Sequence, residues 1–223
     1  MKAKGGRLLM ISILLLLIPS IPLLQISISS DRREMPEERL RYIPSGRYLC
    51  LLSAGYHTLT ADLIWSWSVI SFNKHLRGEG DFTWLPNALE AITTLDPLFR
   101  DAYLYGGVML AMGAGNPEEA VKLLEKGTGK LPDDWQLHFF LGFYRLFFRI
   151  DPLEGIAHLE KAASLPGRPS YLPVLVAKAY TKLGRLELAI RYLEQTKKLI
   201  KDRGLRMKIE SQLAELLKRG PAS

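Results

Sequence analysis

The side chains best able to do chemistry in this 223-residue sequence are four histidines and one cysteine. The histidines are His57, His75, His138 and His158, and no two of them stand three or four residues apart. A helix that binds a metal ion brings two histidines to one face at such a spacing, as in H-E-x-x-H. Three of these histidines have one carboxylate four residues away, which is an ordinary pairing on a helix face. The histidines therefore predict structural roles and no metal site.

The remaining candidates for catalysis also favour structural roles. Cys50 lies in the apolar run RYLCLL, where a buried thiol is inert, and a single cysteine excludes an intrachain disulfide. The acidic pairs at 118–119 and 133–134 stand where helices are expected to begin, and carboxylates there satisfy free N–H groups. The glycine-rich turns at 78–80 and 113–115 follow no strand, as a phosphate-binding loop must. We predict no catalytic residue, no cofactor and no small-molecule substrate.

One segment is unusually rich in aromatic side chains, which suit an apolar contact better than they suit catalysis. It contains Phe139, Phe140, Phe143, Tyr144, Phe147 and Phe148. The elements that position these rings must be helices, because Leu, Ala, Glu, Lys and Arg dominate the sequence and no stretch alternates apolar and polar residues. The composition therefore predicts an all-α fold.

The net charge of +7 is unevenly placed along the chain. Residues 168–223 hold 13 Lys and Arg against 5 Asp and Glu. A basic segment of this kind is either a solvated helix surface or a face for anionic lipid, nucleic acid or an acidic protein. Export of the chain would remove nucleic acid as a partner, and we expect none.

The N-terminal segment is the strongest local signal. Residues 8–28 carry no charge and would span about 31 Å as a helix, which matches the hydrocarbon core of a bilayer. Lys2, Lys4 and Arg7 precede it, so a cleaved signal peptide is the alternative to an uncleaved signal anchor. We favour the anchor, at residues 1–29, because no Ala-x-Ala site follows the apolar run. The short basic N-terminus places the rest of the chain outside the cytoplasmic membrane, which in a bacterium is the periplasm.

Internal repeats set the architecture of the rest of the chain. Pro97, Pro132 and Pro166 each follow a helical stretch, 35 and 34 residues apart. The best-formed unit is 168–202, and the two before it repeat its pattern. The positions that carry the pattern are Tyr103, Gly107, Leu110, Ala120 and Leu124, then Leu141, Gly142 and Ala162, then Ala177, Tyr180, Gly184, Ala189, Ile190 and Leu193.

These units resemble tetratricopeptide repeats, and a weaker unit from about Trp67 to Pro97 extends the resemblance over residues 67–202. The resemblance implies an α-solenoid of about four helical hairpins, in which stacked neighbours share one core. Arg145 departs from the pattern where Tyr is usual, Pro173 departs where Trp is usual, and the first three units need one or two extra residues in their turns.

The remaining segments frame this stack. Residues 30–43 are mostly charged and form a linker, and 44–66 are expected to form capping helices at the N-terminal end. Residues 203–223 form a C-terminal capping helix and tail. In that helix, Leu205, Ile209, Leu213, Leu216 and Leu217 line one face.

In tetratricopeptide stacks the first helix of each hairpin lines a groove that binds protein segments. Carried over to this chain, the resemblance implies a protein-binding groove of Asp101, Leu104 and Val108, then Gln136, Phe139 and Phe143, then Tyr171, Val174 and Lys178. Such a groove suits an apolar or amphipathic peptide segment. In the alternative, Phe139 and Phe143 belong to the core, or residues 44–60 fill the groove. The exposure of these two rings distinguishes the readings.

The function we expect is a non-enzymatic scaffold for protein–protein interaction, anchored in the membrane, that assists assembly or stability of a membrane or secretion complex. The alternative is a stoichiometric structural subunit of such a complex. An enzyme on a helical scaffold would require a polar pocket with clustered carboxylates or histidines.

Overall fold

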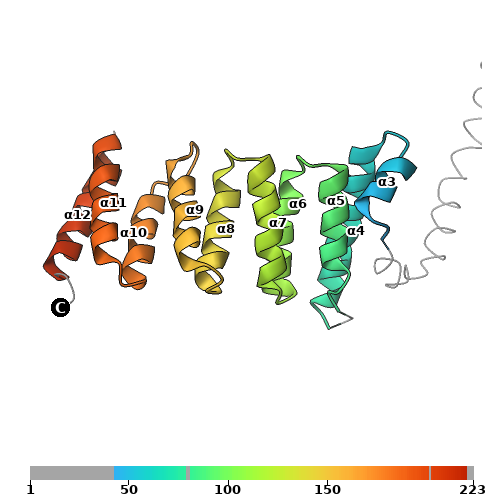
Figure 1. Ribbon diagram of the computed structural model, residues 1–223, viewed down its shortest axis with the longest axis horizontal. Helices are drawn as coiled ribbons and strands as arrows, with labels where there is room; N and C mark the ends of the chain where they lie inside the picture. The colour runs from blue at the N-terminus through green and yellow to red at the C-terminus, as the bar shows by residue number, and fades with distance from the viewer. Residues whose placement is uncertain (1–42, 79–80, 201, 220–223) are drawn as a thin grey trace, which may run out of the picture. The chain divides into compact units, whose positions relative to one another are not determined.

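The computed structural model describes residues 43–78, 81–200 and 202–219. Within these ranges the chain is all-α, with no strand (Figure 1). The elements are α3 (Gly46–Leu52), α4 (His57–His75), α5 (Leu85–Leu95), α6 (Arg100–Val108), the π-helical turn η1 (Met109–Gly113), α7 (Pro117–Lys130), α8 (Trp135–Phe147), α9 (Pro152–Ser164), α10 (Leu172–Lys182), α11 (Leu186–Leu199) and α12 (Arg203–Arg219).

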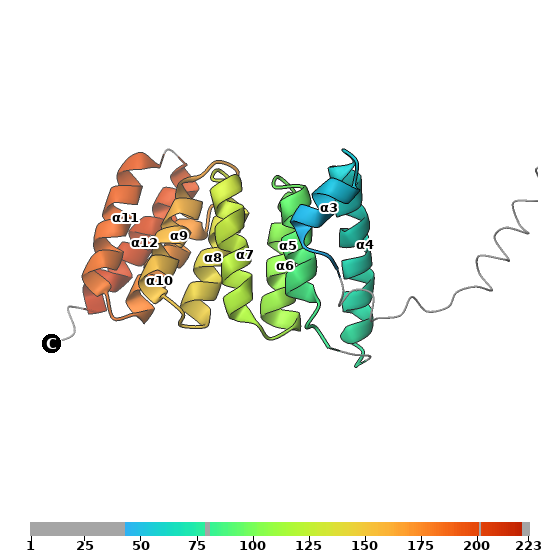
Figure 2. The ribbon, with the colours of Figure 1, turned by 45° about the vertical axis from the view of Figure 1, so that its right-hand side comes forward.

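The helices form antiparallel hairpins that follow one another along the long axis of the domain. The hairpins are α4 with α5, α6 and η1 with α7, α8 with α9, and α10 with α11. The second helix of each hairpin also packs on the next helix along the chain, so the hairpins stack one after another (Figure 2). This arrangement is a helical solenoid, as the repeat pattern predicts.

Asparagine, aspartate and proline define where the middle helices begin. The side chains of Asn116, Asp134 and Asp151 accept hydrogen bonds from backbone N–H groups in the first turns of α7, α8 and α9. Pro117 and Pro152 occupy the first position of α7 and α9, where the missing N–H costs nothing. The acidic pair at 133–134 is therefore used in part as a helix cap, as its position predicts.

The first helix of the second hairpin ends in the π-helical turn η1. α6 continues into Met109–Gly113 with π-helical hydrogen bonding, which accommodates an additional residue in a helix without breaking it. It also brings Gly113 against α4: a Cβ at this position would lie 2.1 Å from Cζ of Phe72.

The ends of the stack differ from each other. At the C-terminal end, α12 buries Leu205, Ile209, Leu213 and Leu216, whereas Leu217 is exposed. At the N-terminal end, α4 is one continuous helix that crosses the boundary predicted between 44–66 and 67–202. The first hairpin therefore begins at His57 and not near Trp67. Only α3, which packs chiefly on α5, corresponds to a separate helix within the predicted cap.

None of the helices in the described ranges combines the length and the hydropathy needed to cross a membrane. The predicted anchor, residues 1–29, and most of the predicted linker lie outside the described residues.

Candidate protein-binding face

The first helices of three hairpins present equivalent side chains on one surface, which we call the first-helix face. Its members repeat every 35 residues along the chain. They are Asp101, Tyr105 and Val108 on α6 with Met112 on η1, then Gln136, Phe140, Phe143 and Phe147 on α8, then Tyr171, Leu175, Lys178 and Lys182 on or beside α10. All are exposed or half-buried, and the side chains between them are turned toward neighbouring helices.

The N-terminal ends of α6 and α8 lie together and are linked by hydrogen bonds, so the two helices run in the same direction in this face. Arg100, at the start of α6, donates from Nε to Asp134 Oδ2 at 2.5 Å and from Nη2 to the side-chain oxygen of Gln136. Met112 and Phe147 therefore lie at the same, C-terminal end of their helices. Both are more than half exposed, at 54% and 60%.

A row of aromatic rings runs along α8, and its last two members belong to the first-helix face. Trp135, Phe139, Phe143 and Phe147 follow at four-residue spacing, with ring centroids 6.4, 6.1 and 5.5 Å apart in turn. Trp135 and Phe139 pack against the core of α9 and α10, while Phe147 extends into solvent. The row thus runs from a packed end to an open end.

The predicted groove residues divide into two groups. Asp101, Val108, Gln136, Phe143, Tyr171 and Lys178 belong to the first-helix face. Leu104 does not, since it is 3% exposed and part of the core. Phe139 and Val174 are half-buried and pack against the clusters of α9 to α12.

The physical reason for this difference is the direction in which α6 is turned about its axis. The open side of each helix follows a spacing of four, three and four residues from its first member, so Tyr105 is accessible in place of Leu104. The accessible residues could have been identified from the sequence by the small or apolar residues at four-residue spacing on the opposite side, which are Ala102, Gly106 and Leu110. All three are buried.

Phe139 and Phe143, whose exposure distinguishes a binding groove from a core, are each half-buried. Phe139 is partly core, and Phe143 lies between Phe139 and Phe147 with part of its ring open. Residues 44–60 do not fill the space over α8, because Tyr48, Leu51, Leu52, Tyr56 and Leu59 are themselves exposed. α3 packs on α5 and α4.

Beneath the face, Arg145 ties α8 to two other helices. Its guanidinium pairs with Glu125 of α7 and with Glu154 of α9, and its side chain is 9% exposed. Its Nε has no hydrogen-bond partner. The departure from the repeat pattern at this position is therefore a buried cation held by two half-exposed carboxylates, and it leaves Arg145 unavailable to a partner.

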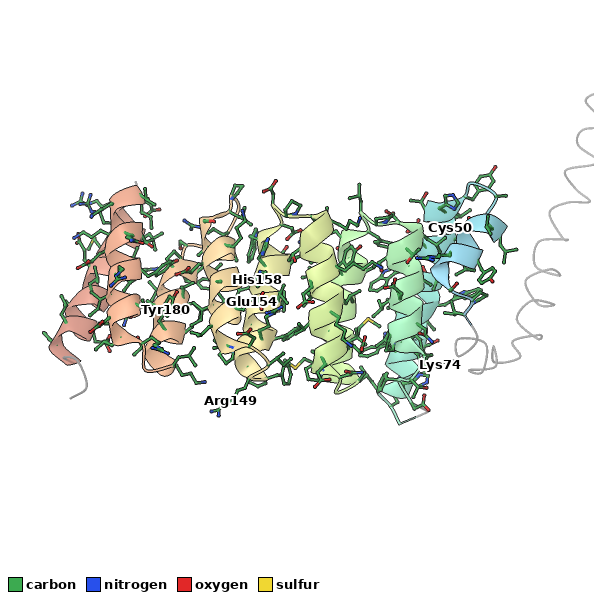
Figure 3. All side chains as sticks on the ribbon, viewed as in Figure 1. Cys50, Lys74, Arg149, Glu154, His158 and Tyr180 are labelled. Carbon is green, nitrogen blue, oxygen red and sulfur yellow. The ribbon has the colours of Figure 1, made fainter. Side chains whose placement is uncertain are left out.

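A histidine pair joins the same two helices. The Nδ1 atoms of His138 and His158 are 3.0 Å apart, and His138 Nε2 lies 3.0 Å from the carbonyl oxygen of Pro132. Since a carbonyl only accepts, the hydrogen-bond network assigns the Nε2 proton to His138 and makes His158 Nδ1 the donor to His138 Nδ1. His158 and Glu154 lie on one side of α9 (Figure 3).

Both imidazoles of the pair are neutral at pH 7. Burial lowers the pKa of His138. Burial, together with the charges on His138 and Arg145, lowers the pKa of His158 to about 4. Within the described ranges no group of three or more His, Cys, Asp or Glu side chains is placed to hold a metal ion. What the arrangement offers chemically is an apolar contact surface with a basic end at Lys178 and Lys182.

No family model matches this chain, and no curated protein is similar to it in sequence. The solved structures that align with it include two crystal structures of MamA. One is 20% identical, covers 68% of this chain and 91% of its own, and has a TM-score of 0.42. The other is 20% identical, covers 66% and 92%, and has a TM-score of 0.41. A likeness this low supports no conclusion about function, and the fold assignment rests on the helices of this chain.

Proposed function

We propose that this chain is a non-enzymatic scaffold that binds a protein partner on the first-helix face. The observation that carries the proposal is the aromatic row of α8, which ends in an exposed Phe147, together with the exposed Tyr105 of α6 and Met112 of η1 at equivalent positions of the preceding hairpin. Large apolar side chains that gather on an open surface mark an interaction site more often than they mark chance exposure. The partner is an apolar or amphipathic segment whose acidic end meets Lys178 and Lys182.

We further propose that residues 1–29 anchor the scaffold in the cytoplasmic membrane, with the helical domain outside the cytoplasm. The uncharged run 8–28 and the basic residues before it support this topology. A scaffold in that place would assist the assembly or stability of a membrane or secretion complex. The resemblance of the repeats to tetratricopeptide units supports protein binding as the mode of action.

Photocrosslinking at defined positions tests the binding face. A benzoylphenylalanine replaces Phe143 in the full chain, expressed in cells, and the matched control carries the same group at Glu194, which is exposed on α11 outside the face. We expect a discrete crosslinked partner from position 143 and none from 194. Phe147→Glu should abolish the product without changing the unfolding midpoint. Equal products from both positions, or a product that survives Phe147→Glu, would contradict the binding face.

Topology and role need separate measurements. Carbonate extraction and C-terminal reporter fusions report whether the chain is integral and where its C-terminus lies. A cytoplasmic C-terminus would reject the anchored, extracytoplasmic arrangement. Co-purification of the crosslinked partner in detergent then reports stoichiometry, and a fixed ratio would make the chain a structural subunit instead of an assembly factor.

A further inference from the structure

The N-terminal end of the stack carries a second apolar surface, which is separate from the first-helix face. It runs along α4, and we call it the α4 stripe. Its members are Tyr56, Leu59, Leu63, Trp67 and Ile70, at spacings of three, four, four and three residues. They are between 45% and 70% exposed. Leu51 and Leu52, at the end of α3, precede the stripe and are exposed as well.

α4 is apolar on two sides. Ala61, Ile64 and Ser68 are buried toward the rest of the stack, and the stripe lies on the other side of the helix. An apolar side of a helix that is left in water costs free energy, so such a side is normally covered by protein or by lipid. Between residues 57 and 73 the only charged side chain is Asp62, which is rotated by about 100° from its neighbour in the stripe.

The other end of the stack shows what a solvated terminus looks like. α12 buries its leucines and exposes charged residues such as Arg206, Lys208 and Glu210. Terminal helices of a solenoid need such a polar outer side to remain soluble. α4 has an exposed polar side at Thr58, Asp62, Ser66 and Asn73, but the stripe beside it is apolar, so the stripe requires something to cover it.

We infer that a lipid surface covers it: the α4 stripe lies in the headgroup layer of an anionic membrane. This inference rests on the proposed anchoring by residues 1–29. If the anchor spans the membrane, the linker of residues 30–43 holds the start of α3 within about 50 Å of the bilayer. Tyr and Trp are side chains that favour this layer. Arg47, Lys74 and Arg77 stand at the two ends of the α3–α4 segment and suit anionic headgroups (Figure 3 shows Lys74).

Two other occupants fit the same surface less well. Residues 8–28 are apolar on every side, so as a cap on α4 they would leave their own outer side in water. A second copy of the chain would bring the cations Arg47, Lys74 and Arg77 near their own equivalents, with Asp62 as the one carboxylate of the two helices to offset them.

Spin labels on the full chain test the inference. In a Cys50→Ser background, a nitroxide is placed at Leu63→Cys in the stripe. The matched control is Thr58→Cys, which is exposed on the same helix but about 140° away from the centre of the stripe. A third label at Leu15→Cys reports the anchor. The purified protein is reconstituted in vesicles of phosphatidylcholine and phosphatidylglycerol, and collisions of each label with oxygen and with a water-soluble nickel chelate are measured.

We expect nickel collisions to fall several-fold at Leu63, with oxygen collisions maintained, while the Thr58 label stays accessible to nickel. If Leu15 is in lipid but Leu63 remains accessible to nickel, the inference is overturned and the anchor stands. Dipolar broadening between Leu63 labels of two chains would show a second copy on the stripe and would also overturn it. A nickel-accessible Leu15 in a chain that does not float with vesicles would refute the anchor, and with it the lipid contact.

Discussion

Gly142 and Gly155 place the backbones of α8 and α9 in direct contact. A Cβ at position 142 would lie 2.5 Å from the carbonyl oxygen of Gly155, and a Cβ at 155 would lie 2.9 Å from the carbonyl oxygen of Gly142. Both obstacles are backbone atoms, which cannot rotate away as a side chain can. The same close approach sets His138 against His158 and Arg145 against Glu154 across the two helices.

Gly142→Ala should therefore destabilise the domain by about 2 kcal/mol, because α8 and α9 must separate to admit the methyl group. The matched control is Gly129→Ala in α7, where a Cβ would meet nothing within 4 Å. That change should stabilise the helix by about 0.5–1 kcal/mol. Urea unfolding of the two variants measures the difference, and equal effects of the same sign would contradict the packing argument.

Removal of the two carboxylates that pair with Arg145 should lower the stability of the domain far more than removal of the arginine itself. Glu125→Gln with Glu154→Gln leaves a buried guanidinium without a counter-charge, and we expect a loss of about 3 kcal/mol. Arg145→Met fills the same space without a charge and should change stability by less than about 1 kcal/mol. Denaturant unfolding measures the free energy of unfolding of both variants. The prediction is wrong if Arg145→Met destabilises the domain more than the double glutamine variant.

Stability should fall in mild acid because of the histidine pair. The folded-state pKa of His158 is lowered to about 4, so the unfolded chain binds more protons between about pH 6.5 and pH 4. The contribution is complete above pH 6.5 and is lost as the pH falls toward 4. Since His158 is only partly buried, we expect its size to be on the order of 1 kcal/mol.

Thermal unfolding of the wild type and of His158→Asn across this range measures the contribution of the pair, because titrating groups away from the pair act equally in both proteins. The wild type should lose more of its unfolding temperature between pH 7 and pH 4.5 than the variant loses. Parallel pH profiles would show that the pair does not carry the effect.

Asp134 should contribute more to the stability of the domain than the adjacent Asp133. It caps α8 by accepting from the backbone N–H groups of Gln136 and Leu137, and it pairs with Arg100 of α6. Asp134→Ala should cost about 1–2 kcal/mol, mainly through loss of the cap. The exposed Asp133 makes the control, and Asp133→Ala should stay within about 0.5 kcal/mol of the wild type. Calorimetry on both variants tests this, and a reversed order would reject the assignment of the cap.

Phe147 and Leu137 should respond differently to truncation, although both are large apolar side chains of α8. Leu137 is fully buried, so Leu137→Ala should cost about 2–5 kcal/mol. Phe147 is 60% exposed, and Phe147→Ala should change stability by less than about 1 kcal/mol. Guanidinium unfolding compares the two, and a large loss for Phe147 would mean that the open end of the aromatic row is part of the core.

Local patterns were enough to predict the helical hairpins and their order. Proline and glycine at a period of 34 to 35 residues mark where helices end, and the leucines of 205–216 mark one apolar side of a terminal helix. The start and the end of each helix depend on neighbours within one or two turns, so the sequence alone determines them. The character of α8 as an aromatic helix was equally readable, since its rings are adjacent in the chain.

Contacts between helices decided the rest. Which side of α6 is open, and hence whether Leu104 or Tyr105 can meet a partner, depends on the helices that pack on both flanks and on the extra residue in η1. Glu125, which pairs with Arg145, and His158, which pairs with His138, each lie 20 residues away from their partner in the chain, beyond any local period. Turning a helix about its axis changes few interactions within the helix but decides which of two adjacent side chains, such as Leu104 and Tyr105, is buried. Only the tertiary packing selects the orientation.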